Sequence, residues 1–344
     1  MTEERRQAWA WVPDKSDLFR GPPPPPLIAP FVRWDANFYL AIANGGYPER
    51  PPDDRPVYAV AFFPLYPLAV RALAMVVGDL FWAAILVANA FALWASLLLF
   101  KLGGRYGSVG DGLRAALLLL IAPGSHFLSF PYPEAMFVAF VAAGLLAIRE
   151  DKLWWAAGWG ALACATRSAG VVIAVCLLYV AWQRRSSLAK SFRAAIAAGL
   201  SLSGVAAFAA FCSQTYGDPL AFAHIQARYL NERSIKLLSG PIQALFAFNV
   251  DPDYYLVTLV AIVLCIRMVR RASAVETLTA WFLLLLPLWT GTLKAMIRYQ
   301  SVNVGLLLGA ARTNSLRAFA VLCIGSAILL VIETVLFSMG MAHY

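Results

Sequence analysis

Long apolar runs alternate with short polar segments from residue 59 to the end of the chain. The runs cover roughly residues 59–77, 80–100, 113–130, 134–149, 153–167, 168–183, 193–213, 254–270, 276–293, 300–311 and 316–340. A helix that crosses a bilayer at right angles needs about 20 apolar residues, and several of these runs are shorter. We therefore expect some helices to be tilted, kinked or partly buried in a bundle. The pattern predicts an all-α, polytopic membrane protein.

Basic residues indicate how the runs are oriented. Half of the 28 Lys and Arg residues lie in short segments between the runs, at 101–114, 149–152, 184–193, 267–271 and 312–317. If residues 101–114 are cytoplasmic and each run from 80–100 onward crosses once, all of these segments are cytoplasmic, as the positive-inside rule requires. The opposite side then receives residues 131–134, the junction at 167–168, the loop 214–253 and residues 294–300. This arrangement predicts a transmembrane bundle of about ten helices in residues 80–344.

The run 59–77 differs from the others because it contains Pro64, Pro67 and Arg71. If it crossed the bilayer, Asp35 would lie on the side opposite to Glu134. We expect instead a helix that lies on the outer surface or re-enters without crossing. Residues 31–79 then form an extracytoplasmic loop with surface helices. Residues 1–30 are polar and then rich in proline, which predicts a stiff lead; no apolar segment of the kind found in signal peptides precedes it.

Composition excludes several other classes of protein. Of the 344 residues, 61% are hydrophobic and 14% are charged, and the mean hydropathy is +0.68. A soluble protein that apolar could not cover its own surface with polar side chains. The net charge of +9 would suit a nucleic-acid partner, but the basic residues lie where topology signals lie, so we expect none. The five cysteines are scattered singly in apolar runs, which predicts neither a metal site nor a disulfide framework.

Two carboxylates stand out near the polar ends of these runs. Asp35 follows Trp34 in a polar segment rich in aromatic residues. It could pair with Arg33, or it could act as a general base that takes a proton from an attacking hydroxyl. Glu134 follows Pro133 and begins the run 134–149, where an acid can simply stabilise a helix N-terminus. The topology places both carboxylates on the same side of the membrane.

Several basic residues are also candidates for function. Arg167 lies between two short apolar runs, and ionisable groups at membrane depth usually face a cavity or a partner. Lys294 and Arg298 lie on the side that the positive-inside rule disfavours, which suggests an anionic ligand such as a phosphate. His126 and His224 lie near predicted helix ends, where a hydrogen-bonded structural histidine is the more common case.

Several short motifs lie at the outer ends of the runs. They are Arg33-Trp34-Asp35 with Tyr39, Ile42-Ala43 and Gly46-Tyr47; Phe62-Phe63-Pro64-Leu65-Tyr66-Pro67; Phe127-Leu128-Ser129-Phe130-Pro131-Tyr132-Pro133-Glu134; Ala165-Thr166-Arg167-Ser168-Ala169-Gly170; Gly217-Asp218-Pro219-Leu220-Ala221-Phe222; and Arg298-Tyr299. In this order they resemble the PIG-V-like mannosyltransferases, a family that includes an enzyme of GPI-anchor synthesis and many bacterial relatives. The resemblance extends over residues 31–300.

The resemblance implies a glycosyltransferase of the GT-C type. Such an enzyme takes a hexose, here mannose, from a polyprenyl-phosphate-sugar donor on the outer face of a bacterial cytoplasmic membrane. It passes the sugar to a hydroxyl of a lipid or glycan acceptor. Asp35 is the expected general base and Glu134 the second catalytic carboxylate, with no metal and no cofactor. The expected substrate-binding residues are Trp34, Tyr39, Tyr47, Arg167, His224, Lys294, Arg298 and Tyr299.

Two other interpretations stay open at the level of sequence. The chain could be a transporter or flippase of lipid-linked sugars, with Arg167 and Glu333 on the translocation path; transporters often show inverted repeats with broken helices. The short runs 153–183 form one such pair, and we find no matching pair in the other half. The chain could also be an inactive relative that serves as a subunit, and a small membrane subunit could accompany an active enzyme. The family normally carries a transmembrane helix before the Trp-Asp loop, whereas residues 1–30 contain no such run.

Overall fold

The computed structural model describes residues 19, 21–49, 57–227, 236–246 and 252–341. All regular structure in these residues is helical, and they contain no strand. The prediction of an all-α protein is confirmed. Most of the predicted lead, residues 1–18 and 20, lies outside the described residues, but Ile28 is buried and Phe19 packs edge-on against Phe81.

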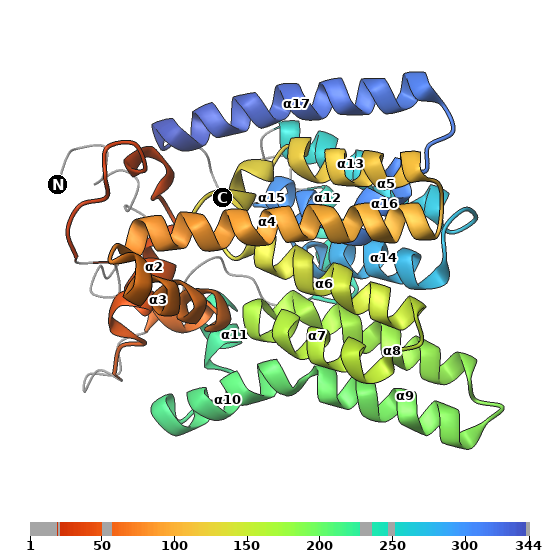
Figure 1. The fold of residues 1–344 in the computed structure, drawn as a ribbon, viewed down its shortest axis with the longest axis horizontal. Coiled ribbons are helices and arrows are strands. Elements are labelled where there is room, and N and C mark those ends of the chain that lie inside the picture. Colours follow the sequence, from red (N-terminus) through yellow and green to blue (C-terminus); the bar gives the residue numbers. More distant parts are fainter. Residues whose placement is uncertain (1–18, 20, 50–56, 228–235, 247–251, 342–344) are drawn as a thin grey trace.

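Most of the helices run side by side in one bundle (Figure 1). They are α4 (Leu80–Arg105), α5 (Val109–Ile121), α6 (Glu134–Arg149), α7 (Leu153–Thr166), α8 (Val172–Gln183), α9 (Leu188–Ser201), α13 (Pro252–Met268), α14 (Ala274–Leu288), α16 (Val304–Ala311) and α17 (Leu316–Met339). Each of them lies on one of the predicted apolar runs, and α6 begins and ends where the pattern predicts. The helices α2 (Ala36–Gly45) and α3 (Leu65–Val77) lie at one end of the bundle.

Length and composition limit which helices could cross a membrane alone. Among the described residues, α4 with 26 residues and α17 with 24 are long and apolar enough. A third span is possible if α9 and α10 (Ser203–Tyr216), which are bent by 41° at a short break, count as one. The other apolar helices are shorter, including α3. These findings are compatible with a membrane helical bundle, and the ten crossings stay a prediction.

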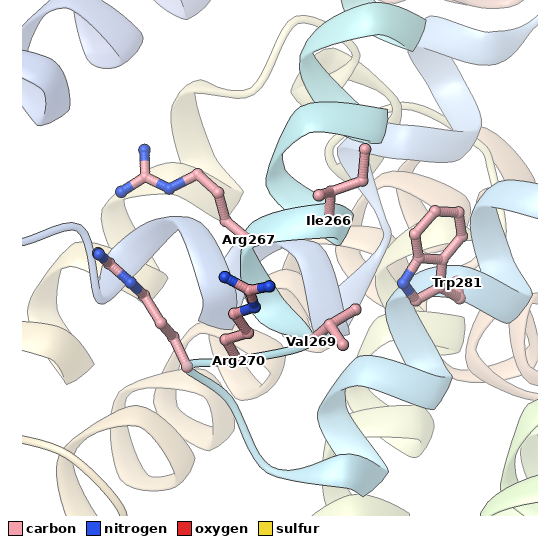
Figure 2. Close-up of a pocket in the computed structure, with 6 residues that line it drawn as sticks. Ile266, Arg267, Val269, Arg270 and Trp281 are labelled. Atoms are coloured by element: carbon pink, nitrogen blue, oxygen red, sulfur yellow. The ribbon is translucent and has the colours of Figure 1, made fainter.

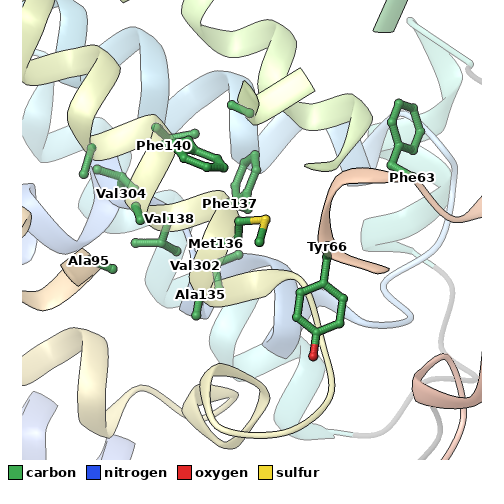
Figure 3. Close-up of a cluster of buried hydrophobic side chains, with 14 of the residues drawn as sticks. Phe63, Tyr66, Ala95, Ala135, Met136, Phe137, Val138, Phe140, Val302 and Val304 are labelled. Atoms are coloured by element: carbon green, nitrogen blue, oxygen red, sulfur yellow. The ribbon is translucent and has the colours of Figure 1, made fainter. Parts of the chain in front are cut away.

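The helix α6 forms the centre of the bundle because its side chains are apolar on every side, which is typical of a helix enclosed by others. Every residue from Glu134 to Ile148 is buried. Figure 3 shows its side chains, among them Phe137 and Phe140, with Ala95 of α4 and Val304 of α16 close by. The position of Glu134 is therefore fixed by packing along the whole helix.

The two ends of the bundle differ in their charges. At one end, the segments predicted to be cytoplasmic contact one another: Arg105 pairs with Glu150, and Arg184 pairs with Asp151. At the other end, the residues predicted to be extracytoplasmic meet at the starts of α2 and α6 and at the end of α7 (Figure 1). The fold therefore separates the two groups of loops as the charge pattern predicts.

Two predicted runs are each divided between two α-helices in the structure. The run 193–213 divides into α9 and α10 beside Leu202, and a Cβ on Gly204 would lie 2.0 Å from Ala161 O of α7. The glycine lets α10 approach α7 backbone to backbone, which a continuous straight helix would prevent. The run 300–311 is also not one helix, because α15 (Met296–Ser301) ends before α16 begins. Buried Asn303 starts α16 by accepting a hydrogen bond from Leu306 N at 3.2 Å.

The predicted loop 214–253 contains two short helices, α11 (Ala221–Ile225) and α12 (Ser239–Leu245). Its residues 228–235 and 247–251 lie outside the described part. Four short 3-10 helices complete the regular structure that the described residues contain: η1 (Ala29–Phe31), η2 (Tyr58–Ala61), η3 (Ser125–Leu128) and η4 (Ser168–Val171). The last of these separates α7 from α8, so the predicted break after Arg167 is confirmed.

Candidate active site

Four charged side chains from four separate helix ends converge into one cluster, which we call the charged cluster: Asp35, Glu134, Arg167 and Arg298. Arg298 on α15 lies at its centre. Its Nη1 donates to Asp35 Oδ2 at 2.5 Å, and its Nε donates to Glu134 Oε1. Arg167 Nη1 donates to the same oxygen of Glu134. The charge pattern predicts that these residues lie on one side of the membrane, and the structure brings them into direct contact.

Burial varies steeply across the charged cluster. The side chain of Glu134 is fully buried and that of Arg298 is 6% exposed, whereas that of Asp35 is 25% exposed. The second oxygen of Glu134, Oε2, is buried and has no hydrogen-bond partner among the described residues. Asp35 is therefore the carboxylate of the cluster that a ligand can reach, and Glu134 lies behind it.

Local backbone geometry positions these side chains. Glu134 is the first residue of α6, where the partial positive charge of the helix N-terminus favours a carboxylate. Asp35 precedes α2, but its side chain makes no capping hydrogen bond, so its carboxylate is directed to Arg298 instead. Trp34 and Ala295, which precede Asp35 and α15, have φ values of 51° and 64°. Such left-handed backbone is strained for residues other than glycine and is often found at functional sites.

Aromatic rings surround the two arginines. The guanidinium carbon of Arg298 lies 4.8 Å from the ring centre of Tyr132 and 5.0 Å from that of Phe127. Arg167 lies 5.4 Å from the ring centre of Tyr299. Cation–π contacts of this kind gain strength where water is excluded. Tyr132 and Phe127 were not predicted as site residues, although both belong to the motif that ends at Glu134.

The surroundings of the charged cluster keep Arg298 charged and keep His126 and Tyr39 neutral. Burial by itself lowers the pKa of Arg298, but the carboxylates of Glu134 and Asp35 outweigh it, so the pKa is raised well above its usual value. Burial, and then the charge of Arg298, lowers the pKa of His126 to about 3. Burial raises the pKa of Tyr39, so its phenol stays protonated. The cluster thus presents a permanent cation beside one accessible carboxylate.

Four other residues were predicted to bind the substrate: Tyr39, Lys294, Tyr47 and His224. Tyr39 is buried, with its ring 6.4 Å from that of Tyr132, and exposed Lys294 lies in the turn before α15. Tyr47 instead donates to Phe62 O at 2.5 Å and packs against Phe208 and Phe211 of α10. His224 pairs with Asp218 at 2.7 Å, and both side chains are exposed. The described contacts of Tyr47 and His224 are thus not with the charged cluster.

The described residues contain no group of three or more His, Cys, Asp and Glu side chains placed to hold a metal ion. All five cysteines are free, and four of them are buried. The four buried cysteines are small residues of the core.

Comparisons with known proteins bear on this site. The family model described as Mannosyltransferase (PIG-V) matches residues 26–233, a segment that contains Asp35, Glu134 and Arg167. GPI alpha-1,6-mannosyltransferase 2 of Rattus norvegicus is 32% identical over 165 residues, which cover 44% of this chain and 32% of that protein. The same enzyme of Mus musculus is 33% identical over 158 residues, 42% of this chain and 30% of that protein.

The matched region thus spans about a third of the length of these curated relatives. The family model covers more than half of this chain, and the motifs that carry the resemblance include residues of the charged cluster. The chain therefore belongs to the PIG-V mannosyltransferase family.

Proposed function

We propose that this protein transfers mannose from a polyprenyl-phosphate-mannose donor to a hydroxyl of a lipid or glycan acceptor, at the extracytoplasmic face of a cytoplasmic membrane. The observation that carries the proposal is the direct contact between Asp35 and Arg298. It joins a partly exposed carboxylate, which can accept a proton, to a buried cation, which can bind a phosphate. Glycosyl transfer from a phosphate donor uses both kinds of group, a proton acceptor for the attacking hydroxyl and a cation for the leaving phosphate.

The proposed reaction is a displacement with inversion at the anomeric carbon. Asp35 accepts the proton of the acceptor hydroxyl as that oxygen forms its bond to the anomeric carbon. The bond between the anomeric carbon and the phosphate oxygen breaks, and its electron pair leaves with the polyprenyl phosphate. Arg298 stabilises the charge that builds on this phosphate, because a cation fixed in a dry site needs no reorganisation during the reaction. No redox step or additional reactant is required.

The two contacts of Arg298 suggest how donor binding prepares the base. Its Nε is held by Glu134, while its Nη1 is held by Asp35. A donor phosphate can take the place of Asp35 at Nη1 while Glu134 keeps the guanidinium in position. This exchange leaves the carboxylate of Asp35 free to accept a hydrogen bond from the acceptor hydroxyl. Glu134, although buried, therefore acts as a positioning residue for both arginines.

The surroundings of the charged cluster assign roles to further residues. Trp34 and Tyr299 supply aromatic surface for the sugar, and Tyr39 supplies a protonated phenol beneath it. Lys294, exposed before α15, adds positive charge for the donor phosphate. We leave Tyr47 and His224 outside this scheme, because their described contacts lie elsewhere.

The helix α3 is proposed to lie on the membrane surface next to the site. It has 13 residues, fewer than the about 20 that a crossing needs. One side packs on the bundle through Tyr66 and Val70, while Met75 and Val76 are exposed. An apolar face of this kind can enter the boundary of the bilayer. Asp35 would then stand where a lipid-borne sugar arrives.

The test uses the purified full chain in lipid nanodiscs with radiolabelled polyprenyl-phosphate-mannose and membrane lipids as acceptors. Asp35→Asn should slow transfer by about 10²–10⁴-fold, the usual cost of losing a general base. Donor binding should persist, because Arg298 is unchanged. Arg298→Lys keeps the charge but loses the planar fork, so it should weaken both donor binding and transfer. Asp218→Asn, which alters an exposed acid outside the charged cluster, is the matched control.

Two outcomes would contradict the proposal. If a well-folded Asp35→Asn protein kept more than about a tenth of the wild-type rate, Asp35 would not be the base. If the wild-type protein transferred no sugar but moved lipid-linked sugar between the leaflets of a vesicle, the transporter interpretation would replace the enzyme.

A further inference from the structure

A second feature lies at the opposite end of the bundle from the charged cluster. A cavity of about 620 Å³ is formed by the C-terminal end of α13, the turn that follows it, and α14. It is lined by Ile266, Arg267, Val269, Arg270, Arg271 and Trp281, shown in Figure 2. Its size is typical of sites that bind small molecules. We call it the arginine cavity.

The three arginines of this cavity have no carboxylate partner among the described residues. Some other arginines at this end of the bundle are paired, such as Arg105 with Glu150 and Arg184 with Asp151. Glu276 is the single acidic residue in the segment from Arg267 to Trp281. It is already engaged by Arg312, which donates to both of its oxygens. The positive charge of the cavity is therefore not neutralised within the described structure.

The cavity also has an apolar side. Ile266 and Val269 are 57% and 62% exposed, and Trp281 is half-buried on the facing helix. In Figure 2 the guanidinium group of Arg267 points away from the side on which Ile266 and Trp281 lie. A free inorganic anion would need the arginines alone. A ligand that is anionic at one end and apolar at the other would use both sides.

Hydrogen bonds hold the turn between α13 and α14 in place. The carbonyl of Met268 accepts from Arg271 N at 3.0 Å, from Ala272 N at 2.9 Å and from Thr277 Oγ1 at 3.3 Å. The Met268 side chain is buried. Because this backbone is fixed, binding at the cavity would require only side chains to become ordered, which lowers the entropic cost of association.

We propose that the arginine cavity binds the phosphate headgroup of an anionic phospholipid. Arg267, Arg270 and Arg271 would donate to the phosphate oxygens, since guanidinium groups match phosphate geometry. Ile266, Val269 and Trp281 would contact the first carbons of an acyl chain. Anionic lipids are concentrated in the cytoplasmic leaflet, the side predicted for this end. The site is independent of the proposed transfer reaction, because it shares no residue with the charged cluster.

The test titrates the detergent-solubilised full chain with dioctanoyl phosphatidylglycerol, dioctanoyl phosphatidylcholine and inorganic phosphate, and measures each dissociation constant by calorimetry. The triple variant R267Q/R270Q/R271Q should weaken phosphatidylglycerol binding by about 100-fold, since each basic residue contributes about fivefold. A matched triple variant, R185Q/K190Q/R193Q, removes the same charge from exposed positions in the turn before α9 and in the first part of that helix. It should change binding by less than about twofold. W281A should weaken phosphatidylglycerol binding without changing that of phosphate.

The outcomes separate a lipid site from simpler explanations. Equal losses in the two triple variants would show general attraction to a basic surface, which would overturn the proposal. Binding of inorganic phosphate as tight as that of phosphatidylglycerol would also overturn it, because the apolar side would then contribute nothing. All the replaced arginines are exposed, so the variants should fold, and R270Q alone should still weaken binding by about fivefold.

Discussion

The two ends of the helical bundle both contain ion pairs, but they use them differently. Arg105 and Arg184 at the basic end are 52% and 30% exposed in their pairs with Glu150 and Asp151. Exposed pairs of this kind contribute about 0–1 kcal/mol to stability. In the charged cluster, Glu134 is fully buried and shared by two arginines. Burying such charges has a large desolvation cost that their attraction often fails to repay.

The difference shows which end serves function. A buried charge that adds little net stability is best explained by a functional role. Ionisable groups with strongly shifted pKa values are found at functional sites for this reason. The paired arginines of the basic end need no functional explanation, because exposed ion pairs change the free energy of unfolding very little. In the arginine cavity of the same end, three arginines lie together without a carboxylate partner among the described residues. Two of the predictions below compare a closely packed position near the charged cluster with a more open one elsewhere.

The largest effect is expected from Glu134→Ala. It removes the acceptor between Arg167 and Arg298, so that Arg167 loses its carboxylate partner and Arg298 keeps only Asp35. Breaking a buried pair in this way typically costs about 3–5 kcal/mol of unfolding free energy. Reversible unfolding in detergent, followed by circular dichroism, measures this loss. Glu150→Ala at the basic end is the control and should leave the midpoint unchanged. Equal losses in both variants would show that the two ends are energetically alike.

A smaller effect is expected from lowering the pH. His126 has a pKa of about 3 in the folded protein, against about 6.5 when unfolded. Below pH 6.5 the histidine therefore binds a proton in the unfolded chain but not in the folded protein. The stabilising contribution of the neutral histidine is fully present above pH 6.5 and is lost as the pH falls. Between pH 7 and pH 5 this amounts to about 2 kcal/mol of unfolding free energy.

The histidine contribution can be isolated with His126→Asn, which should flatten the dependence on pH in this range. Arg298 and Glu134 both act on His126, but neither changes charge between pH 5 and pH 7 in the arrangement described. A slope that survives in the variant would assign the effect to another group.

The smallest effect distinguishes a crowded glycine from an open one. A Cβ on Gly124 would lie 3.0 Å from Ser301 Oγ and 3.2 Å from Arg298 Cα. Gly124→Ala should therefore destabilise the protein by about 1 kcal/mol, at the low end for overpacking because a shift of tenths of an ångström relieves it. Gly199 in α9 has nothing within 4 Å of such a Cβ. Gly199→Ala should stabilise by about 0.5–1 kcal/mol, because alanine favours a helix. Effects of the same sign would contradict the comparison.

The sequence predicted the elements whose ends are marked by residues that stop helices. Both ends of α6 were predicted correctly, because Pro133 precedes the helix and a charged segment follows Arg149. The break after Arg167 was visible as a charge between two short runs. In both cases local chemistry decided the structure, and no distant contact was needed to see it.

Other features could not be predicted because they depend on distant contacts. The run 193–213 contains no proline that would mark its break, and the close approach of Gly204 to α7 depends on a distant part of the chain. The separation of α15 from α16 was missed, although Asn303 is a common residue at a helix start. Topology placed Asp35 and Arg298 on one side of a membrane, but only packing shows that they touch. The contacts of Tyr47 with α10 likewise could not be predicted from the pattern of apolar residues.

The sequence distance within the charged cluster has a consequence for biosynthesis. Arg298 follows Glu134 by 164 positions, whereas Arg167 follows it by 33. At about 5–20 residues per second, a ribosome needs about 10–30 s to deliver Arg298 after Glu134 has emerged. During this interval α6 must be accommodated with Arg167 as the earlier of its two counter-ions. The residue proposed to hold the donor phosphate is thus also the last member of the charged cluster to emerge from the ribosome.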